Sequence, residues 1–269
     1  MEVSRSGYCR YLKSYDPNKV PADFELISKV KEIHHPSKGK YGTRRISEHL
    51  KETGYDIGRY RARTLMKKAG VSVTYKRKFK HTTDSEHSLP AAKNILNRKF
   101  DVDRPNTVWR SDITCLWTRE GWIYLAVVID LYSRKVVGRS INSHMKVSLV
   151  SDALKMAYFR RRPIKGLVHH SDRGSQYASN EYQKLLDQNG MIRSMSRKGN
   201  CWDNAVVESF FHTLKTERTN EKRYLARDEA KYDVIDYIEM FYNCTRLHSS
   251  IGYKSPNDFE HIYTFSFIA

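Results

Sequence analysis

The chain has 269 residues, 39% hydrophobic and 12% aromatic, which is enough for a packed core and too much for a disordered chain. Its formal charge of +18 favours a polyanionic partner, with nucleic acid the first candidate and a ribosomal or merely soluble basic protein the alternative. The longest apolar run, Trp122–Ile129, is far shorter than the ~20 residues of a membrane helix, so we expect no membrane partner.

The positive charge is concentrated in the first part of the chain. Residues 1–104 contain 24 Lys and Arg against 12 Asp and Glu, whereas residues 105–269 contain 24 against 18. The first part is therefore the stronger candidate for binding a phosphate backbone.

Residues 22–70 are expected to be helical, because apolar residues recur there at helical spacing. A glycine turn near Gly54 precedes a last helix that starts near Gly58 and carries Arg59, Arg61 and Arg63. A basic helix after a glycine turn predicts a helix-turn-helix whose second helix enters the major groove of DNA. A small helical bundle with a solvated basic face is the alternative.

A polar stretch without apolar periodicity follows and opens with the basic cluster KRKFK. We expect four regions: a helical DNA-binding region at 1–75, a basic and polar linker at 76–105, a catalytic core at 106–220, and a C-terminal helix and tail at 221–269.

The core region changes to the pattern of an α/β domain. Strands are expected first, in an antiparallel hairpin, and alternating helices and strands follow. This order is that of a ribonuclease H-like mixed sheet. The expected strands are Thr107–Thr118, Trp122–Ile129, Ser133–Asn142, Gly166–Ser171 and Met191–Met195; the expected helices are Met145–Arg162, Ser179–Asn189 and Asp203–Thr219. One more helix is predicted at 227–247, after which Gly and Pro are expected to end the regular structure.

Three acids occupy positions that suit a metal site. Asp112 lies inside the first expected strand, Asp172 follows the fourth, and Glu208 lies on the polar side of a helix. Carboxylates are the hard oxygen ligands that Mg²⁺ prefers, and two ions about 4 Å apart can clamp an in-line phosphoryl transfer. Asp112 would bridge the ions, and Lys215, two helical turns after Glu208, can contact a phosphate. Asp130 competes for this role, although it also fits a turn acid paired with Arg134 or Lys135.

Four longer segments carry a family resemblance: WRSDIT, HSDRGSQY, SRKGNCWDNAVVESFFHTLKTE and YNCTRLHSSIGYKSP. Together they resemble the DDE transposases of bacterial insertion sequences, most closely the second-reading-frame product of the insertion-sequence-three family. Asp172 and Glu208 have 35 residues between them, the spacing that this family shares with retroviral integrases. The resemblance extends over residues 1–262.

The resemblance implies an integrase-like catalytic core in which Asp112, Asp172 and Glu208 are catalytic and bind Mg²⁺ or Mn²⁺. Such enzymes cut one DNA strand with water and use the freed 3′-OH to attack another phosphodiester. The resemblance also implies homo-oligomers on DNA, and an upstream reading frame product that adds a second helix-turn-helix and a leucine zipper. The chain opens at MEVSRSGYCR, so we expect it to need that partner. A cytoplasmic, nucleoid-associated bacterial protein is expected.

Other polar and aromatic residues have two interpretations each. Arg197 and Lys198 are expected to contact DNA from a loop before the Glu208 helix. Trp109 and Trp117 are expected in the core rather than as base-stacking platforms. His169 and His170 are expected to have structural or DNA-adjacent roles, since imidazole suits Zn²⁺ more than Mg²⁺. Arg246 could contact DNA or cap a helix end.

Two further functions remain open from the sequence. One is a catalytically silent DNA-binding regulator that uses residues 22–70. The other is a ribonuclease H-type nuclease without joining activity, which a DNA-binding region at the N-terminus disfavours.

Overall fold

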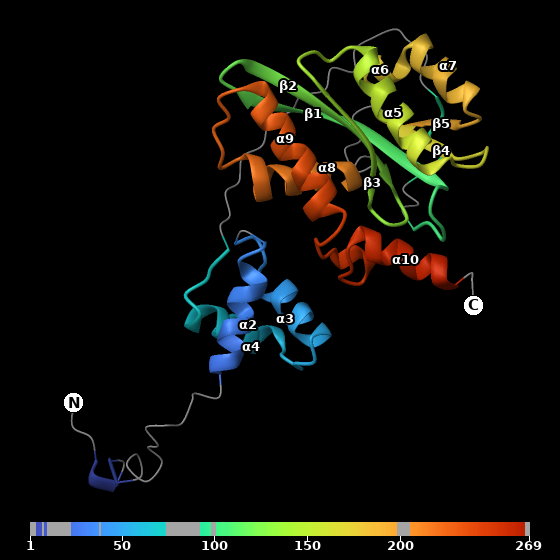
Figure 1. Ribbon diagram of the computed structural model, residues 1–269. Coiled ribbons are helices and arrows are strands. Elements are labelled where there is room, and N and C mark those ends of the chain that lie inside the picture. Colours follow the sequence, from blue (N-terminus) through green and yellow to red (C-terminus); the bar gives the residue numbers. More distant parts are fainter. Residues whose placement is uncertain are drawn as a thin grey trace. The chain divides into compact units, whose positions relative to one another are not determined.

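The computed structural model describes residues 4–6, 8–9, 23–37, 39–73, 92–97, 101–197 and 205–266 (Figure 1). The chain forms two compact units, Met1–Thr74 and Tyr75–Ala269, which we describe separately. No helix in the described ranges is both long and apolar enough to cross a membrane.

In residues 23–73 of the first unit, helices bury the apolar residues that the sequence pattern identifies. They are α2 (Phe24–His34), α3 (Thr43–Glu52) and α4 (Arg59–Lys68). Gly54 has a φ of +93°, which glycine adopts without strain, and it turns the chain between α3 and α4. Ser47 of α3 donates a hydrogen bond to the Ile57 carbonyl, which ties the segment before α4 to α3. The helical, helix-turn-helix-like unit is therefore confirmed.

The second unit is built on a five-stranded mixed sheet in the order β3-β2-β1-β4-β5. The β1–β2 and β2–β3 pairs are antiparallel, and β4 adds parallel to β1 and β5 parallel to β4. This order confirms the ribonuclease H-like prediction. The strands are β1 (Val108–Thr118), β2 (Gly121–Asp130), β3 (Val136–Asn142), β4 (Val168–Ser171) and β5 (Ile192–Met195).

Helices cover both faces of this sheet (Figure 1). One face packs against α5 (Val147–Arg161), the short α6 (Ser175–Ala178) and α7 (Asn180–Gln188). The other packs against α8 (Ala205–Leu214) and α9 (Arg227–Asp236), which continue as π-helical segments at Lys215–Thr219 and Tyr237–Tyr242. The helix expected at 203–219 begins outside the described residues, and the one expected at 227–247 ends five residues earlier.

The C-terminal tail does not end the regular structure, contrary to the prediction. A helix, α10, spans Pro256–Ser266, after a 3₁₀ turn at Ser249–Ile251. Ser255 caps this helix, because its hydroxyl accepts the Asp258 amide and donates to the Asp258 carboxylate. Proline usually ends a helix, yet at the first helical position its missing N–H breaks no hydrogen bond, because that group has no partner inside the helix.

Candidate active site

Strand register brings Asp112 and Asp172 together. β1 and β4 run in parallel, and residues 108–110 of β1 each pair with the residue 60 positions later, as Arg110 does with His170. Asp112 and Asp172 keep this offset two residues beyond the last pair. Asp172 is thus at the carboxyl end of β4, where α/β sheets bind ligands.

Asp112 faces the helix that carries the third acid. It lies opposite Val127 on β2, and cross-strand partners point to the same side of a sheet. Val127 belongs to the core cluster that includes Val207 and Phe210 of α8. The carboxyl group of Asp112 is buried and accepts a hydrogen bond from the Ile113 amide at 2.7 Å.

A tight turn holds the Asp172 carboxylate. Its Oδ1 accepts the Gly174 amide at 2.8 Å, while the Arg173 guanidinium donates to the Ser196 carbonyl. A side chain at position 174 would place its Cβ 3.0 Å from Asp172 Oδ1. The turn therefore favours glycine because of this close approach, since a larger residue would displace the Asp172 carboxylate, and not because of an unusual φ.

Glu208 and Lys215 come from the helix on the same face. Val207, Phe210, Phe211 and Leu214 anchor α8 in the core, which leaves Glu208 on the exposed side. Lys215 begins the π-helical segment that extends α8 and is half-buried. Such π-helical turns occur frequently at functional sites.

The electrostatics join these residues into one site. Burial raises the pKa of Asp112 well above its ordinary value, and the charges of Asp172 and Glu208 raise it further, against the opposing effect of Arg110. Burial lowers the pKa of Lys215, and the charge of Asp112 opposes that shift. Like charges that repel one another in a buried place are stabilised by a cation.

The donor set fits a divalent ion of the Mg²⁺ or Mn²⁺ type. Carboxylate oxygens are hard ligands, and the repulsion that Asp172 exerts on Asp112 is what such an ion would relieve. Among the described residues, no three His, Cys, Asp or Glu side chains lie together as a group that could hold a metal ion, so the structure does not bring Glu208 into one cluster with Asp112 and Asp172. Asp112 and Asp172 would form the inner pair of ligands, and Glu208 would approach from the exposed side of α8.

Asp130, the competing acid, has a different environment. Its carboxylate is fully buried and accepts hydrogen bonds from the amides of Asn106 and Tyr132, at 2.7 and 2.9 Å, and from the Trp109 indole. The Arg161 guanidinium is 3.8 Å away. The expected side-chain pairing with Arg134 or Lys135 is thus replaced by backbone amides and Arg161, and this acid joins β1, β2 and α5.

The histidines before Asp172 are buried, as a structural role requires. His169 Nε2 lies 2.8 Å from the Ser111 hydroxyl and 3.0 Å from that of Tyr182. Burial lowers the pKa of His169 to about 3, so its ring is neutral. His170 Nδ1 contacts the Ser194 hydroxyl at 2.8 Å.

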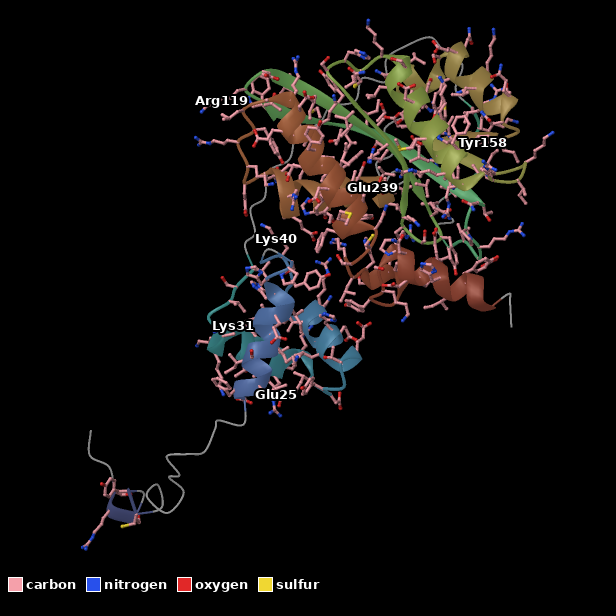
Figure 2. All side chains as sticks on the ribbon, in the orientation of Figure 1. Glu25, Lys31, Lys40, Arg119, Tyr158 and Glu239 are labelled. Atoms are coloured by element: carbon pink, nitrogen blue, oxygen red, sulfur yellow. The ribbon has the colours of Figure 1, made fainter. Side chains whose placement is uncertain are left out.

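The two tryptophans beside Asp112 differ. Trp109 is fully buried, as predicted, but Trp117 is 58% exposed, so the prediction of a core position is wrong. Trp117 lies opposite Trp122, and the two rings meet edge to face near the β1–β2 turn, where Figure 2 labels Arg119. Side chains alternate between the two faces along β1, which places Trp117 on the α5 side of the sheet. The core on that side includes Trp109 and Ile113 but not Trp117, which lies near the end of the strand.

The Arg246 side chain is buried in an ion pair, and neither of its two expected roles describes this position. It is buried and forms two hydrogen bonds with the Glu217 carboxylate, at 2.8 and 2.7 Å, and Tyr237 donates a third. This ion pair ties the tail to the π-helical segment that begins with Lys215. The sequence gives no sign of this ion pair, because Glu217 and Arg246 are 29 residues apart.

The basic residues proposed for DNA contact lie in both units. Arg59, Arg61 and Arg63 are all on the exposed side of α4, although Arg61 also pairs with Asp23. Arg197 is exposed and donates to the side chain of Asn97. Lys198 lies outside the described residues.

Family models cover most of the chain. An HTH-like domain model matches residues 21–79, and two integrase core domain models match residues 102–201 and 189–256.

The chain is also similar to curated transposases and to a protein of an insertion element. The chain is 43% identical over 97% of its length to an insertion element IS600 31 kDa protein of Shigella sonnei, covering 96% of that protein. It is 44% identical over 91% of its length to the transposase of IS904 from Lactococcus lactis, and 42% identical over 83% to the transposase InsF of IS3A from Escherichia coli, covering 97% and 78% of those proteins.

A chain of the simian T-cell lymphotropic virus intasome, solved with a PP2A regulatory subunit, shares the fold with a TM-score of 0.51 at 17% identity, covering 86% of this chain and 74% of that one. The likeness of the fold agrees with the sheet order described above. The chain belongs to the insertion-sequence-three family of transposases, enzymes with an integrase-type catalytic core.

Proposed function

We propose that Asp112, Asp172 and Glu208 are the catalytic acids of this transposase and that they hold two divalent ions, Mg²⁺ or Mn²⁺. The observation that supports the proposal is the register of β1 and β4, whose 60-residue offset Asp112 and Asp172 keep two residues beyond the last pair. When bound, the two ions would polarise the attacking and leaving oxygens of a phosphodiester.

The reaction has two phosphoryl transfers. In the first, a water oxygen bonds to phosphorus and the bond to the 3′-oxygen breaks, which leaves a 3′-OH. In the second, that 3′-OH bonds to phosphorus of the target strand and displaces another 3′-oxygen. Each step exchanges one P–O bond for another, so no nucleotide cofactor is needed. Lys215, which is half-buried and whose pKa the charge of Asp112 raises, would contact a non-bridging phosphate oxygen.

DNA binding is assigned in this proposal to both units. Arg59, Arg61 and Arg63 on α4 would contact the insertion-sequence ends, because exposed cations on the second helix of a helix-turn-helix meet the DNA major groove. Arg197 and Lys198 would contact DNA near the acids. We also infer a homo-oligomer on DNA and an upstream reading frame product as partners, acting on nucleoid DNA in bacterial cytoplasm.

The residue boundaries of the regions are part of the proposal. Residues 1–75 would bind DNA, 76–105 would link, 106–220 would carry the acids, and 221–269 would support them. Supporting this last role, α9 shares a core cluster with α8 and β2.

The test compares two aspartates in a cleavage assay. The substrate is duplex DNA with the inverted repeat that flanks the coding frame, incubated with Mg²⁺ or Mn²⁺. Asp172→Asn is expected to abolish cleavage while DNA binding in a gel-shift assay survives. Asp152→Asn, an exposed position on α5, serves as the control and should cleave normally. Cleavage by Asp172→Asn at the control rate would refute the assignment, and cleavage by neither protein would favour a silent regulator.

A further inference from the structure

A surface pocket of about 240 Å³ lies where the strands β1 and β4 begin. It is lined by the loops that precede these strands, residues 104–107 and 162–167. Three of its side chains are cations, namely Arg104, Arg162 and Lys165, and no Asp or Glu is among the described residues that line it. The pocket therefore concentrates positive charge at one end of the sheet.

The three cations of the pocket are not neutralised by their neighbours. They are exposed, and they form no ion pair or side-chain hydrogen bond with another residue in the described ranges. The two arginines before Arg162 differ in this respect. Arg160 forms an ion pair with Glu239 at 2.9 Å. Arg161 forms one with Glu260 at 2.7 Å. These acids are thus already occupied, and the pocket keeps its positive charge.

Hydrogen bonds between the two loops hold the pocket in shape. The Val168 amide donates to the Thr107 carbonyl, which extends the parallel pairing of β1 and β4. The Arg161 guanidinium donates to Asn106 Oδ1 at 2.9 Å, which ties α5 to the loop before β1. Asn106 and Thr107 also line the pocket, and side-chain amides and hydroxyls commonly donate hydrogen bonds to phosphate oxygens. A site that is formed before its ligand arrives loses less entropy on binding.

The pocket and the acids lie at opposite ends of the β1–β4 pair. Asp112 is five positions after Thr107, and Asp172 is five positions after Leu167. At about 3.3 Å per residue, five positions of strand span about 16 Å, which is beyond the reach of an arginine or lysine side chain. Duplex DNA carries a phosphate about every 3.4 Å along each strand, so a duplex bound near the acids presents other phosphates at this distance.

We propose that Arg104, Arg162 and Lys165 bind backbone phosphates of duplex DNA at the end of the sheet opposite the acids. DNA is the polyanion on which a transposase acts, and its phosphates are complementary to a pocket lined by cations, an amide and a hydroxyl. No aromatic ring is among the described lining residues, so bases have no surface on which to stack, and the contact is independent of sequence. The inference concerns binding alone and does not depend on which acids are catalytic.

The experiment measures how the affinity of the full chain for DNA depends on salt, by fluorescence anisotropy without divalent ions. One labelled duplex has the inverted repeat that flanks the coding frame, and the other has a scrambled sequence. For the double variant Arg162→Gln/Lys165→Gln, we expect about tenfold weaker binding at about 0.1 M salt. The slope of log affinity against log salt should be smaller by about two, and equally so for both duplexes.

A second variant and two controls accompany this measurement. Arg104→Gln, on the other loop, should lower the slope by about one. Lys155→Gln/Lys231→Gln removes the same charge from exposed helix positions that have ion pairs, and it should keep the wild-type slope. Arg162→Lys/Lys165→Arg conserves the charge and should also keep it. Thermal unfolding without DNA should give each pocket variant a Tm within about 2 °C of wild type, because the changed side chains are exposed.

Three outcomes would overturn the proposal. The first is an unchanged slope in Arg162→Gln/Lys165→Gln, and a change in the sedimentation of its DNA-free form would then show that the pocket faces a second copy of the chain. The second is an equal loss in this variant and in Lys155→Gln/Lys231→Gln, because only the total charge would then matter. The third is a loss confined to the inverted-repeat duplex, since backbone phosphates are common to both sequences.

Discussion

Two buried aspartates on neighbouring strands, Asp112 and Asp130, lie three residues apart in the β1–β2 register and have opposite surroundings. Asp130 is surrounded by donors, since two amides, an indole and Arg161 all point at it. Asp112 is instead approached by the charges of Asp172 and Glu208. Burial raises both pKa values, so burial alone does not identify a catalytic acid. The type of neighbour does: donors indicate a structural acid, and further acids indicate a cation site.

The largest expected effect comes from exchanging each acid for its amide. Asp112→Asn should reduce DNA cleavage by about 10³-fold or more, because it removes a proposed metal ligand. Its free energy of unfolding should not fall, since a repelled buried charge disappears. Asp130→Asn should show the reverse, with lower stability and normal cleavage per folded molecule. Urea unfolding and a cleavage assay on both variants test this difference. A destabilised but active Asp112→Asn would contradict it.

Arg161→Leu should have the next largest effect, which is a loss of stability near Asp130. Arg161 forms two hydrogen bonds with the buried Glu260, at 2.9 and 2.7 Å, and a third with Asn106. Its loss leaves Glu260 with Lys135 as the remaining ion-pair partner in the described chain, so we expect a loss of about 3 kcal/mol in urea unfolding. The double variant with Glu260→Gln should recover part of it. An unchanged midpoint would contradict this account.

The pH dependence of stability should show the environment of Asp130. The pKa of Asp130 is raised to about 6 by burial, so the folded state binds more protons than the unfolded state between pH 4 and 6. Stability from this group is therefore present at low pH and is lost as pH rises to about 6, by up to about 3 kcal/mol. Asp130→Asn should flatten that part of the curve. A wild-type curve that rises from pH 4 to 6 and is unaltered by Asp130→Asn would contradict the shift.

The smallest expected effect tests how tightly the turn holds Asp172. Gly174→Ala places a methyl group 3.0 Å from Asp172 Oδ1 and 3.2 Å from Gln176 Oε1, so the carboxylate must move. We expect cleavage to fall about 10- to 100-fold with little loss of stability. Gly58→Ala is the control, since its added Cβ meets nothing within 4 Å. Equal cleavage by both variants would show that the turn tolerates the shift.

Local pattern predicted much of this molecule. Helical spacing identified the cores of α2 to α4, and strand chemistry identified all five strands within about three residues of their observed starts. The 35-residue interval between Asp172 and Glu208 pointed to a family that the comparisons confirm. The assignment of the three acids and of the DNA-contacting arginines stays a prediction.

The predictions that failed have one physical cause. The position of a residue in the sheet, or its contact with a distant segment, overrides the structure that its neighbours in sequence favour. Trp117 is aromatic and lies on the same face of β1 as the buried Trp109, yet it is exposed and outside the core cluster of that face. Arg246 looks like a surface cation, yet Glu217 neutralises it in the interior. Pro256 reads as a breaker, but the capping serine before it makes it a helix start.

Residue type and spacing along the chain were enough to predict the basic character, the order of the sheet strands and the family, because none of these depends on contacts between distant segments. Only the tertiary structure decided which buried acid meets other acids and which meets donors. It also decided that Arg246 lies in the interior, paired with Glu217. These features depend on register and packing between segments tens of residues apart, and a strand's neighbours are not encoded within the strand.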